Sequence, residues 1–361
     1  MLTFALLTVI ILLLRNQVRK LPMGGTRQTR EEKYSRYVMA LIVVLAAFRS
    51  EEVGADTPGY MREYGEMARL SWDAISVRFV GYSLYYYMSK VFSTMHMPLF
   101  VWFGFVELFY VFSMKLFIDR YSNDKLLSWL IFSTMGLFAF SLAGLKQVMG
   151  MGFMMYAYLA FTNENQAKFR YLYTFLLVFA AYMCHSVCLV FLPAFALYFI
   201  RNSRFFYIFV IAIIAIIAIG GESILTGAAL QYEESTGNSH FATYLEFESN
   251  HSPVMLIFYI CMILFCIPGF RNFHKEEQDL FKVSFAFCAI ACSLQVLAFL
   301  SPHAFRFAFL FLPFYMSLLP KSMMYSSGHI IGLQKTLIVC SLVFYFLYVN
   351  RSYVYAMDLI F

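Results

Sequence analysis

Charged residues are scarce in this sequence. Only 13% of its 361 residues are Asp, Glu, Lys or Arg, whereas a soluble domain carries about 25%. Apolar residues make up 61% of the chain instead, and no single water-soluble core can bury that share. The composition therefore excludes a soluble globular domain and indicates a membrane protein, whose apolar surface faces lipid.

The short motifs of several enzyme classes are also missing. No Walker loop, GxSxG or HExxH sequence occurs, so neither an ATP-driven pump nor a hydrolase of those types is indicated. Six of the seven Cys residues occur in pairs inside apolar runs, and we interpret them as buried packing thiols rather than metal ligands. The net charge of +6 is interpreted as cytoplasmic Lys and Arg rather than as a nucleic-acid-binding surface.

Unbroken apolar runs predict that the spanning elements are helices. Residues 205–220 (FFYIFVIAIIAIIAIG) are too uniformly apolar for a barrel strand, whose side chains alternate between lipid and a wet lumen. We predict an all-α polytopic membrane protein with about 12 transmembrane helices, built as a single integral-membrane domain over residues 1–361. The first run lacks the flanks of a cleaved signal peptide and is interpreted as a retained span. The runs cover residues 1–14, 35–48, 76–94, 97–117, 126–144, 147–161, 171–184, 186–200, 204–220, 254–270, 279–300, 304–319 and 333–350.

The connectors between these runs differ in charge, which predicts their side of the membrane. Two acidic connectors, at about 49–75 and 221–253, are predicted to be external loops. The side assignments agree with one another if run 76–94, which carries Arg78, Lys90 and four tyrosines, is an interfacial or re-entrant helix. Both termini are then external. The connectors predicted to be cytoplasmic are the basic ones at residues 15–36, 119–125, 163–170, 201–204, 271–282 and 321–335.

A small set of polar residues falls at the predicted outer ends of the helices, where charged groups are costly and tend to be functional. The cations Lys146 and Arg306 suit a pyrophosphate group, and His185 or Asp56 can accept a proton from a hydroxyl. Each residue also has a structural interpretation. The cations can reach lipid headgroups, the histidine can be a packed helix-end residue, and the aspartate opens a turn-forming DTPG sequence. The tyrosines at 82 and 85–87 form either an interfacial aromatic belt or a sugar-stacking platform.

Four segments resemble the sequence elements of the EpsG family, in the family's order and over most of the chain. FRSEEVGADTPGYMREYGEM resembles the "R…VGtDt..Y…f" element, and FSLAGLKQVMGMGFMMYAYLAF resembles the "FN..RQ.iA..i.l.a" helix. KFRYLYTFLLVFAAYMCHSVCLVFLPAFAL resembles the family's His-bearing segment, and FRFAFLFLPFYMSLLP resembles its late Arg-bearing helix. One residue departs from the pattern. Lys146 stands where the family usually has Arg, which keeps the charge and loses the bidentate geometry.

The resemblance implies a Wzy-like polymerase, a glycosyltransferase that extends exopolysaccharide, capsule or O-antigen at the outer face of the bacterial inner membrane. The implied substrate is an undecaprenyl-pyrophosphate-linked oligosaccharide. Membrane lipids, a chain-length regulator and a flippase are the implied partners, without nucleic acid. No cofactor or metal is expected, because two cations can supply the electrostatic stabilisation. On this basis the predicted catalytic residues are Asp56, His185 and Arg306, and the predicted substrate-binding residues are Lys146, Gln147, Tyr60, Tyr64 and His303.

Three other functions stay open. A lipid-linked sugar flippase or transporter needs polar residues along a path across the bilayer, whereas the charges here cluster near one face. A membrane glycosyltransferase that uses a polyprenyl-phosphate sugar usually carries an acidic pair in its first external loop, which the acidic connector 49–73 can supply. An acyltransferase of the polysaccharide would fit the lone intramembrane His185, but it leaves the DTPGY element unexplained.

Overall fold

The protein, for which we use a computed structural model, folds entirely as helices within the residues that the structure describes. This confirms the predicted all-α class. The chain groups into two compact units, residues 1–189 with 342–361 and residues 190–341, and the assignment of one membrane domain stays a prediction. The residues described are 2–20, 27–79, 82–164, 169–236, 253–270, 275–301, 304–326 and 328–349.

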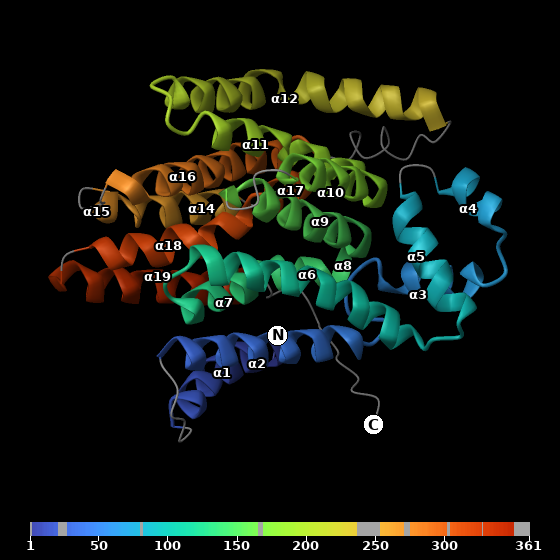
Figure 1. The fold of residues 1–361 in the computed structure, drawn as a ribbon, viewed down its shortest axis with the longest axis horizontal. Coiled ribbons are helices and arrows are strands. Elements are labelled where there is room, and N and C mark those ends of the chain that lie inside the picture. Colours follow the sequence, from blue (N-terminus) through green and yellow to red (C-terminus); the bar gives the residue numbers. More distant parts are fainter. Residues whose placement is uncertain are drawn as a thin grey trace. The chain divides into compact units, whose positions relative to one another are not determined.

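Long helices in contact form the body of the first unit. Helix α6 contacts both α2 and α9, α9 packs along α10, and α1 contacts α2 and α7 (Figure 1). α10 buries a narrow stripe that includes Ala181 and Cys184, and it exposes large apolar side chains such as Phe175, which suits a face turned to lipid. The bounds are Leu2–Lys20 (α1), Arg27–Ala47 (α2), Leu99–Tyr121 (α6), Lys125–Thr134 (α7), Leu145–Phe161 (α9) and Arg170–Cys184 (α10).

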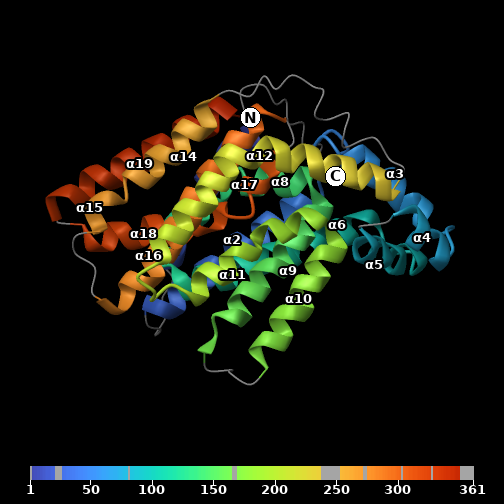
Figure 2. The same cartoon turned by 90° about the horizontal axis from the view of Figure 1, so that it is seen from above.

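Three short helices lie at one end of the first unit: α3 (Thr57–Met67), α4 (Trp72–Arg78) and α5 (Ser83–Thr94). Figures 1 and 2 both show them together near the start of α6. The predicted run 76–94 thus becomes the end of α4 and the whole of α5. With 12 residues α5 is about 18 Å long, too short to cross a hydrocarbon core of about 30 Å by itself. Its interfacial position stays a prediction.

Two breaks divide the chain between α7 and α9. The predicted run 126–144 forms α7 and α8 (Leu137–Ala143), which are bent by 46°. Gly136 makes the bend with φ of 90°, a left-handed conformation that glycine adopts without a steric penalty. Gly144 then separates α8 from α9 with φ −108° and ψ 51°. The second break places Lys146 in the first turn of α9.

The lengths and compositions of the helices support a membrane protein. Three of the described helices are long and apolar enough to cross a bilayer, namely Leu99–Tyr121, Phe206–Ser223 and Phe281–Phe299. The bent pair of α7 and α8 makes a fourth if it counts as one span, and shorter apolar helices accompany these. The count of about 12 crossings and the sides of the connectors stay predictions.

Helix α16 (Lys275–Val296) contacts several other helices of the second unit. It packs against α12, α14, α17 and α18 (Figure 2). The rings of Phe287 and Phe314 meet at 4.4 Å between centroids in its core. α12 continues to Thr236, well into the predicted loop 221–253, of which residues 237–252 lie outside the described residues. The remaining bounds are Leu192–Phe199 (α11), Phe206–Thr236 (α12), Val254–Leu264 (α14), Ile267–Phe270 (α15), Phe305–Ala308 (α17), Tyr315–Tyr325 (α18) and Gly328–Val349 (α19).

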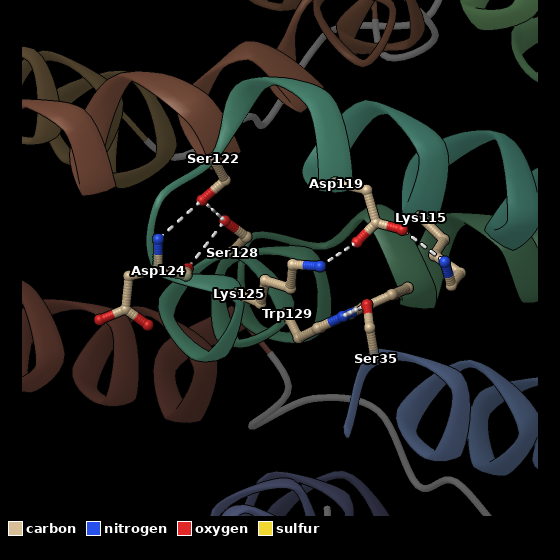
Figure 3. Close-up of polar contacts among 8 residues, drawn as sticks. All are labelled: Ser35, Lys115, Asp119, Ser122, Asp124, Lys125, Ser128 and Trp129. Carbon is tan, nitrogen blue, oxygen red and sulfur yellow. Dashed lines mark hydrogen bonds and ion pairs between the residues drawn. The ribbon is translucent and has the colours of Figure 1, made fainter. Parts of the chain in front are cut away.

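A polar cluster ties α6 to α7 at the end of the first unit opposite α3–α5 along α6 (Figure 3). Asp119 forms ion pairs with Lys115, one turn earlier on α6, and with Lys125 at the start of α7, where Nζ lies 2.5 Å from Oδ1. The indole of Trp129 on α7 donates to the Ser35 hydroxyl on α2 at 2.8 Å. Three helices are therefore joined by polar contacts in a region where the sequence predicts only a short basic connector.

Replacing Asp119 with alanine should lower the free energy of unfolding by about 1–3 kcal/mol, because it leaves two mostly buried lysines without their shared carboxylate. Denaturant unfolding in detergent micelles measures the change. Glu66→Ala is the matched control, because the Glu66–Arg78 pair is about half exposed and its loss should cost about 0–1 kcal/mol. Equal losses of unfolding free energy in the two variants would show that the Asp119 ion pairs contribute no more stability than an exposed pair.

Candidate active site

Lys146 carries the ammonium group at the centre of the candidate site, and three tyrosine rings surround it. Its Nζ lies 4.7 Å from the ring centroid of Tyr86, 5.2 Å from that of Tyr82 and 5.4 Å from that of Tyr60. All three distances are within the roughly 6 Å over which a cation is attracted to an aromatic face. Nζ also lies 3.6 Å from Oε2 of Glu63, which makes an ion pair rather than a hydrogen bond.

Three segments far apart in the sequence build this site. α3 supplies Tyr60 and Glu63, and the start of α5 supplies Tyr82 and Tyr86. Residues three or four positions apart share a face of a helix, so each pair points toward the same neighbour. α3 packs on α5, and α5 packs on α10, the partner of α9. These contacts bring both pairs to the first turn of α9, where Lys146 lies.

Glu63 links the ammonium group to the tyrosines. The Tyr86 hydroxyl donates to Oε2 of Glu63 at 2.8 Å, and the same oxygen faces Lys146. Burial and the negative charge of Glu63 raise the pKa of Tyr86 above its ordinary value, so the phenol stays protonated and keeps donating. The side chains of Glu63 and Lys146 are 29% and 20% exposed. Both charged groups are therefore held in place and still accessible to a ligand.

His185 lies at the end of α10, beside the tyrosines. Its backbone is extended, with φ −165° and ψ 119°, and its ring meets the Tyr82 ring edge-on at 5.2 Å. The backbone N–H of Val187 donates to Nδ1 at 3.3 Å. Since Nδ1 accepts a hydrogen bond, the neutral ring carries its proton on Nε2. The half-buried His185 is thus oriented as a hydrogen-bond donor through Nε2.

Three other predicted residues lie in the first unit, with different surroundings. Asp56 is exposed at the start of α3, and its negative charge acts on Lys146. The buried Tyr64 donates its hydroxyl to the Met97 carbonyl at 2.7 Å, which fastens α3 to the segment before α6. Gln147 is buried on α9. The structure therefore brings Tyr60 to Lys146, leaves Asp56 exposed at the start of the same helix and gives Tyr64 a structural contact.

Two further predicted site residues, Arg306 and His303, stay predictions. Arg306 lies on α17 in the second unit, so its pairing with Lys146 stays a prediction. His303 lies outside the described residues. Among those described, no group of three or more His, Cys, Asp or Glu could hold a metal ion.

Sequence reasoning missed the roles of Glu63, Tyr82 and Tyr86. In the sequence Glu63 is one of several acids in an acidic connector, and the tyrosines at 82 and 86 indicate an aromatic belt or a sugar-stacking platform. The signal was their spacing, because Tyr60 and Glu63 are three residues apart and Tyr82 and Tyr86 are four apart. Each pair therefore marks one face of a short helix, and of the two helices only α5 lies within a predicted apolar run.

Comparison with known proteins identifies the family. The model of the EpsG family matches residues 33–360, nearly the whole chain and all of the site around Lys146. Searches of curated proteins and of solved structures found no match. The four sequence elements that suggested the family are all inside the matched range. The chain therefore belongs to the EpsG family.

Proposed function

We propose that this protein is a Wzy-like polysaccharide polymerase that joins undecaprenyl-pyrophosphate-linked oligosaccharide units at the outer face of the bacterial inner membrane. Membership of the EpsG family supports this class of reaction. The observation that carries the proposal is the accessible Lys146 ammonium group, held between Glu63 and three tyrosine rings in the first turn of α9. A fixed cation of this kind suits a phosphate-bearing substrate.

The proposed reaction transfers a growing sugar chain from one lipid carrier to the next unit. The C1–O bond to undecaprenyl pyrophosphate breaks, and its electron pair stays on the pyrophosphate oxygen. A sugar hydroxyl of the next lipid-linked unit forms the new C1–O bond and releases its proton. The site must therefore stabilise negative charge on the leaving pyrophosphate and must accept one proton.

Lys146 fits the first of these roles. Its ammonium group provides a positive charge that does not have to reorganise when the leaving group becomes more negative. The first turn of α9 adds the partial positive charge of a helix N-terminus. A compact ammonium ion is also well matched to the cage of Tyr60, Tyr82 and Tyr86, which attracts it without satisfying its hydrogen bonds. This gives a physical reason for lysine at a position where the family usually has arginine.

The residue that we propose as proton acceptor differs from those predicted from the sequence. Glu63 is an accessible carboxylate beside Lys146 and is our first candidate to accept the proton from the attacking hydroxyl, with Asp56 as the second. His185 already accepts a hydrogen bond at Nδ1. Its neutral ring therefore donates through Nε2, which suits holding a substrate oxygen.

Purified protein in phospholipid vesicles tests the proposal directly. Given undecaprenyl-pyrophosphate-linked repeat units, it should produce a ladder of longer chains and release one undecaprenyl pyrophosphate for each new linkage. A flippase would instead move single units across the membrane, and a polyprenyl-phosphate-dependent transferase would add sugars only from that donor. In cells, deletion of the gene should leave single units on the surface. Loss of all surface glycan would overturn the assignment in favour of an earlier step.

The orientation of His185 predicts which substitution keeps activity. His185→Gln places an amide donor near the position of Nε2 and should keep more activity than His185→Ala. In His185→Ala we expect the rate of chain extension to fall about 10- to 100-fold, because a positioning hydrogen bond is lost. His185→Asn, whose amide reaches only the position of Nδ1, is the matched control. The rate of chain extension in vesicles measures all three. If Gln and Asn behave alike, donation through Nε2 is not the role of His185.

A further inference from the structure

A second polar network lies behind the candidate site, and the Thr57 hydroxyl is its centre. Its Oγ1 lies 2.5 Å from the Val53 carbonyl oxygen and 3.3 Å from the Leu142 carbonyl oxygen, and it accepts from Nε of Arg49 at 3.3 Å. Thr57 is fully buried. The single hydroxyl proton points toward the two carbonyl oxygens, and one lone pair of Oγ1 accepts from Arg49, which restricts the orientation of the hydroxyl.

The Thr57 hydroxyl lies between the two segments that carry the charged residues of the candidate site. Thr57 is the first residue of α3, the helix that carries Glu63 six residues later. Leu142 lies in the last turn of α8, and Lys146 follows it by only four residues. Gly54 lies so close to Leu142 that a Cβ there would collide with the Leu142 carbonyl. The segments that carry Lys146 and Glu63 are therefore joined by a short chain of contacts that passes through Thr57.

Arg49 is the cation that supports the network. It is buried, its Nη1 donates to the Ala46 carbonyl at 3.1 Å, and its guanidinium group lies 4.0 Å from the ring centroid of Phe103. Burial lowers the pKa of Arg49 to about 10, and the charge of Glu107 acts in the opposite direction. A buried charge is costly without such partners. Arg49 is thus part of the folded structure rather than a mobile surface cation.

Glu107 makes a second polar contact with the end of α8. It is fully buried on α6, and its Oε1 accepts a hydrogen bond from the Ser141 hydroxyl at 2.9 Å. Ser141 precedes Leu142, so the end of α8 is held at two adjacent residues. One connection runs through Thr57 and Arg49, and the other runs through Glu107. None of these side chains takes part in the proposed chemistry.

We infer that Thr57, Arg49 and Glu107 are positioning residues, which set the separation between Lys146 on α9 and Glu63 on α3. The inference rests on the proposed function for its effect on catalysis. The geometric part can be tested without any substrate, because Lys146 should become more accessible when the network is cut.

The test compares three threonine substitutions by chemical labelling of the folded protein in detergent. Thr57→Val keeps the shape and removes the hydroxyl, whereas Thr57→Ser keeps the hydroxyl. Thr174→Val is the matched control, because Thr174 is a mostly buried threonine of α10 whose hydroxyl also bonds to backbone carbonyls. Acetic anhydride labels lysines, and mass spectrometry reports the rate at Lys146 and at Lys90, which is held by the Met67 and Leu70 carbonyls.

We expect the labelling rate of Lys146 to rise about threefold or more in Thr57→Val, the factor that corresponds to one lost hydrogen bond. Thr57→Ser should stay near the wild-type rate, and Thr174→Val should not raise it. General unfolding would instead raise the rates at Lys146 and Lys90 together. In the polymerase assay, Thr57→Val should lower kcat about tenfold with little change in KM, because misplaced groups act on the reacting complex.

The possible results separate the two proposals. An unchanged Lys146 rate in Thr57→Val, or an equal rise at Lys90, overturns the positioning role. A selective rise at Lys146 in a protein whose wild-type form makes no polymer supports the positioning role and overturns the proposed function. A selective rise with unchanged kcat means that the network sets the geometry of Lys146 without serving catalysis, which overturns the catalytic half of the inference.

Discussion

Replacing Lys146 with alanine is expected to lower the rate of chain extension about 100- to 1,000-fold, the range for loss of one fixed group that stabilises charge in a transition state. The physical reason is that the Lys146 ammonium group brings a positive charge to Glu63 and to the three tyrosines at the centre of the site. Extension assays in vesicles, corrected for the amount of folded protein, measure the effect.

Two further variants distinguish charge from shape. Lys146→Arg keeps the charge with a larger, planar group, so we expect about a tenth of the wild-type rate or more. Arg62→Ala is the control, because Arg62 is an exposed cation next to Glu63 on α3. Its removal should leave the rate within about twofold, as for most surface substitutions. A Lys146→Ala protein that folds and extends chains at the wild-type rate would remove Lys146 from the mechanism.

Replacing Gly54 with alanine is expected to give the largest loss of stability near the site, about 2 kcal/mol or more. Gly54 has φ of 87°, where an L-residue carries a penalty of about 1–2 kcal/mol. The added Cβ would also collide with the Leu142 carbonyl, which is backbone and cannot move without shifting the end of α8. Thermal unfolding in detergent measures the loss, and the extension assay should show reduced activity in the protein that stays folded.

Gly65→Ala is the matched control for this prediction. Gly65 lies inside α3, and a Cβ there would meet no atom within 4 Å. Alanine is the better helix residue, so this variant should be more stable than the wild type by about 0.5–1 kcal/mol. If Gly54→Ala unfolds at the same temperature as Gly65→Ala, the loop does not depend on the contact between Gly54 and Leu142.

Lys146 and Gly54 lie in the same part of the molecule and have different roles there. We expect Lys146 to act on the substrate, whereas Gly54 allows the loop before α3 to lie against Leu142, four residues before Lys146. The VGADT sequence is therefore of interest for its backbone and for the Thr57 hydroxyl, in addition to the Asp56 carboxylate that sequence analysis singled out. We expect a change in this loop to reach the site through α3 and α8.

Much of the fold could be predicted from the sequence because apolar runs are local signals. The run at 97–117 became α6 with ends shifted by a few residues, and the runs at 147–161 and 171–184 became α9 and α10. Breaks inside a run were harder to predict. Gly136 and Gly144 lie in an almost wholly apolar stretch, and only their backbone angles show that α8 is separate from both neighbours.

The candidate site was predictable only in part. Lys146 and His185 stood out because polar groups at the ends of apolar helices are unusual, and Asp56 stood out in a recognisable motif. Glu63 and the tyrosines at 60, 82 and 86 are ordinary residues for an external loop or a membrane interface. Their importance comes from the packing of α3 on α5 and of α5 on α10.

The sequence by itself determined that the protein is helical, that it belongs in a membrane and which family it resembles. These properties follow from composition and from patterns along the chain. Only the tertiary structure decided that Glu63 and three tyrosines surround Lys146, that Nδ1 of His185 is already occupied, and that Thr57 joins the two sides of the site. The physical reason is that each of these facts is a contact between segments at least 20 residues apart or a local hydrogen bond set by backbone angles, and neither is encoded in hydrophobic periodicity.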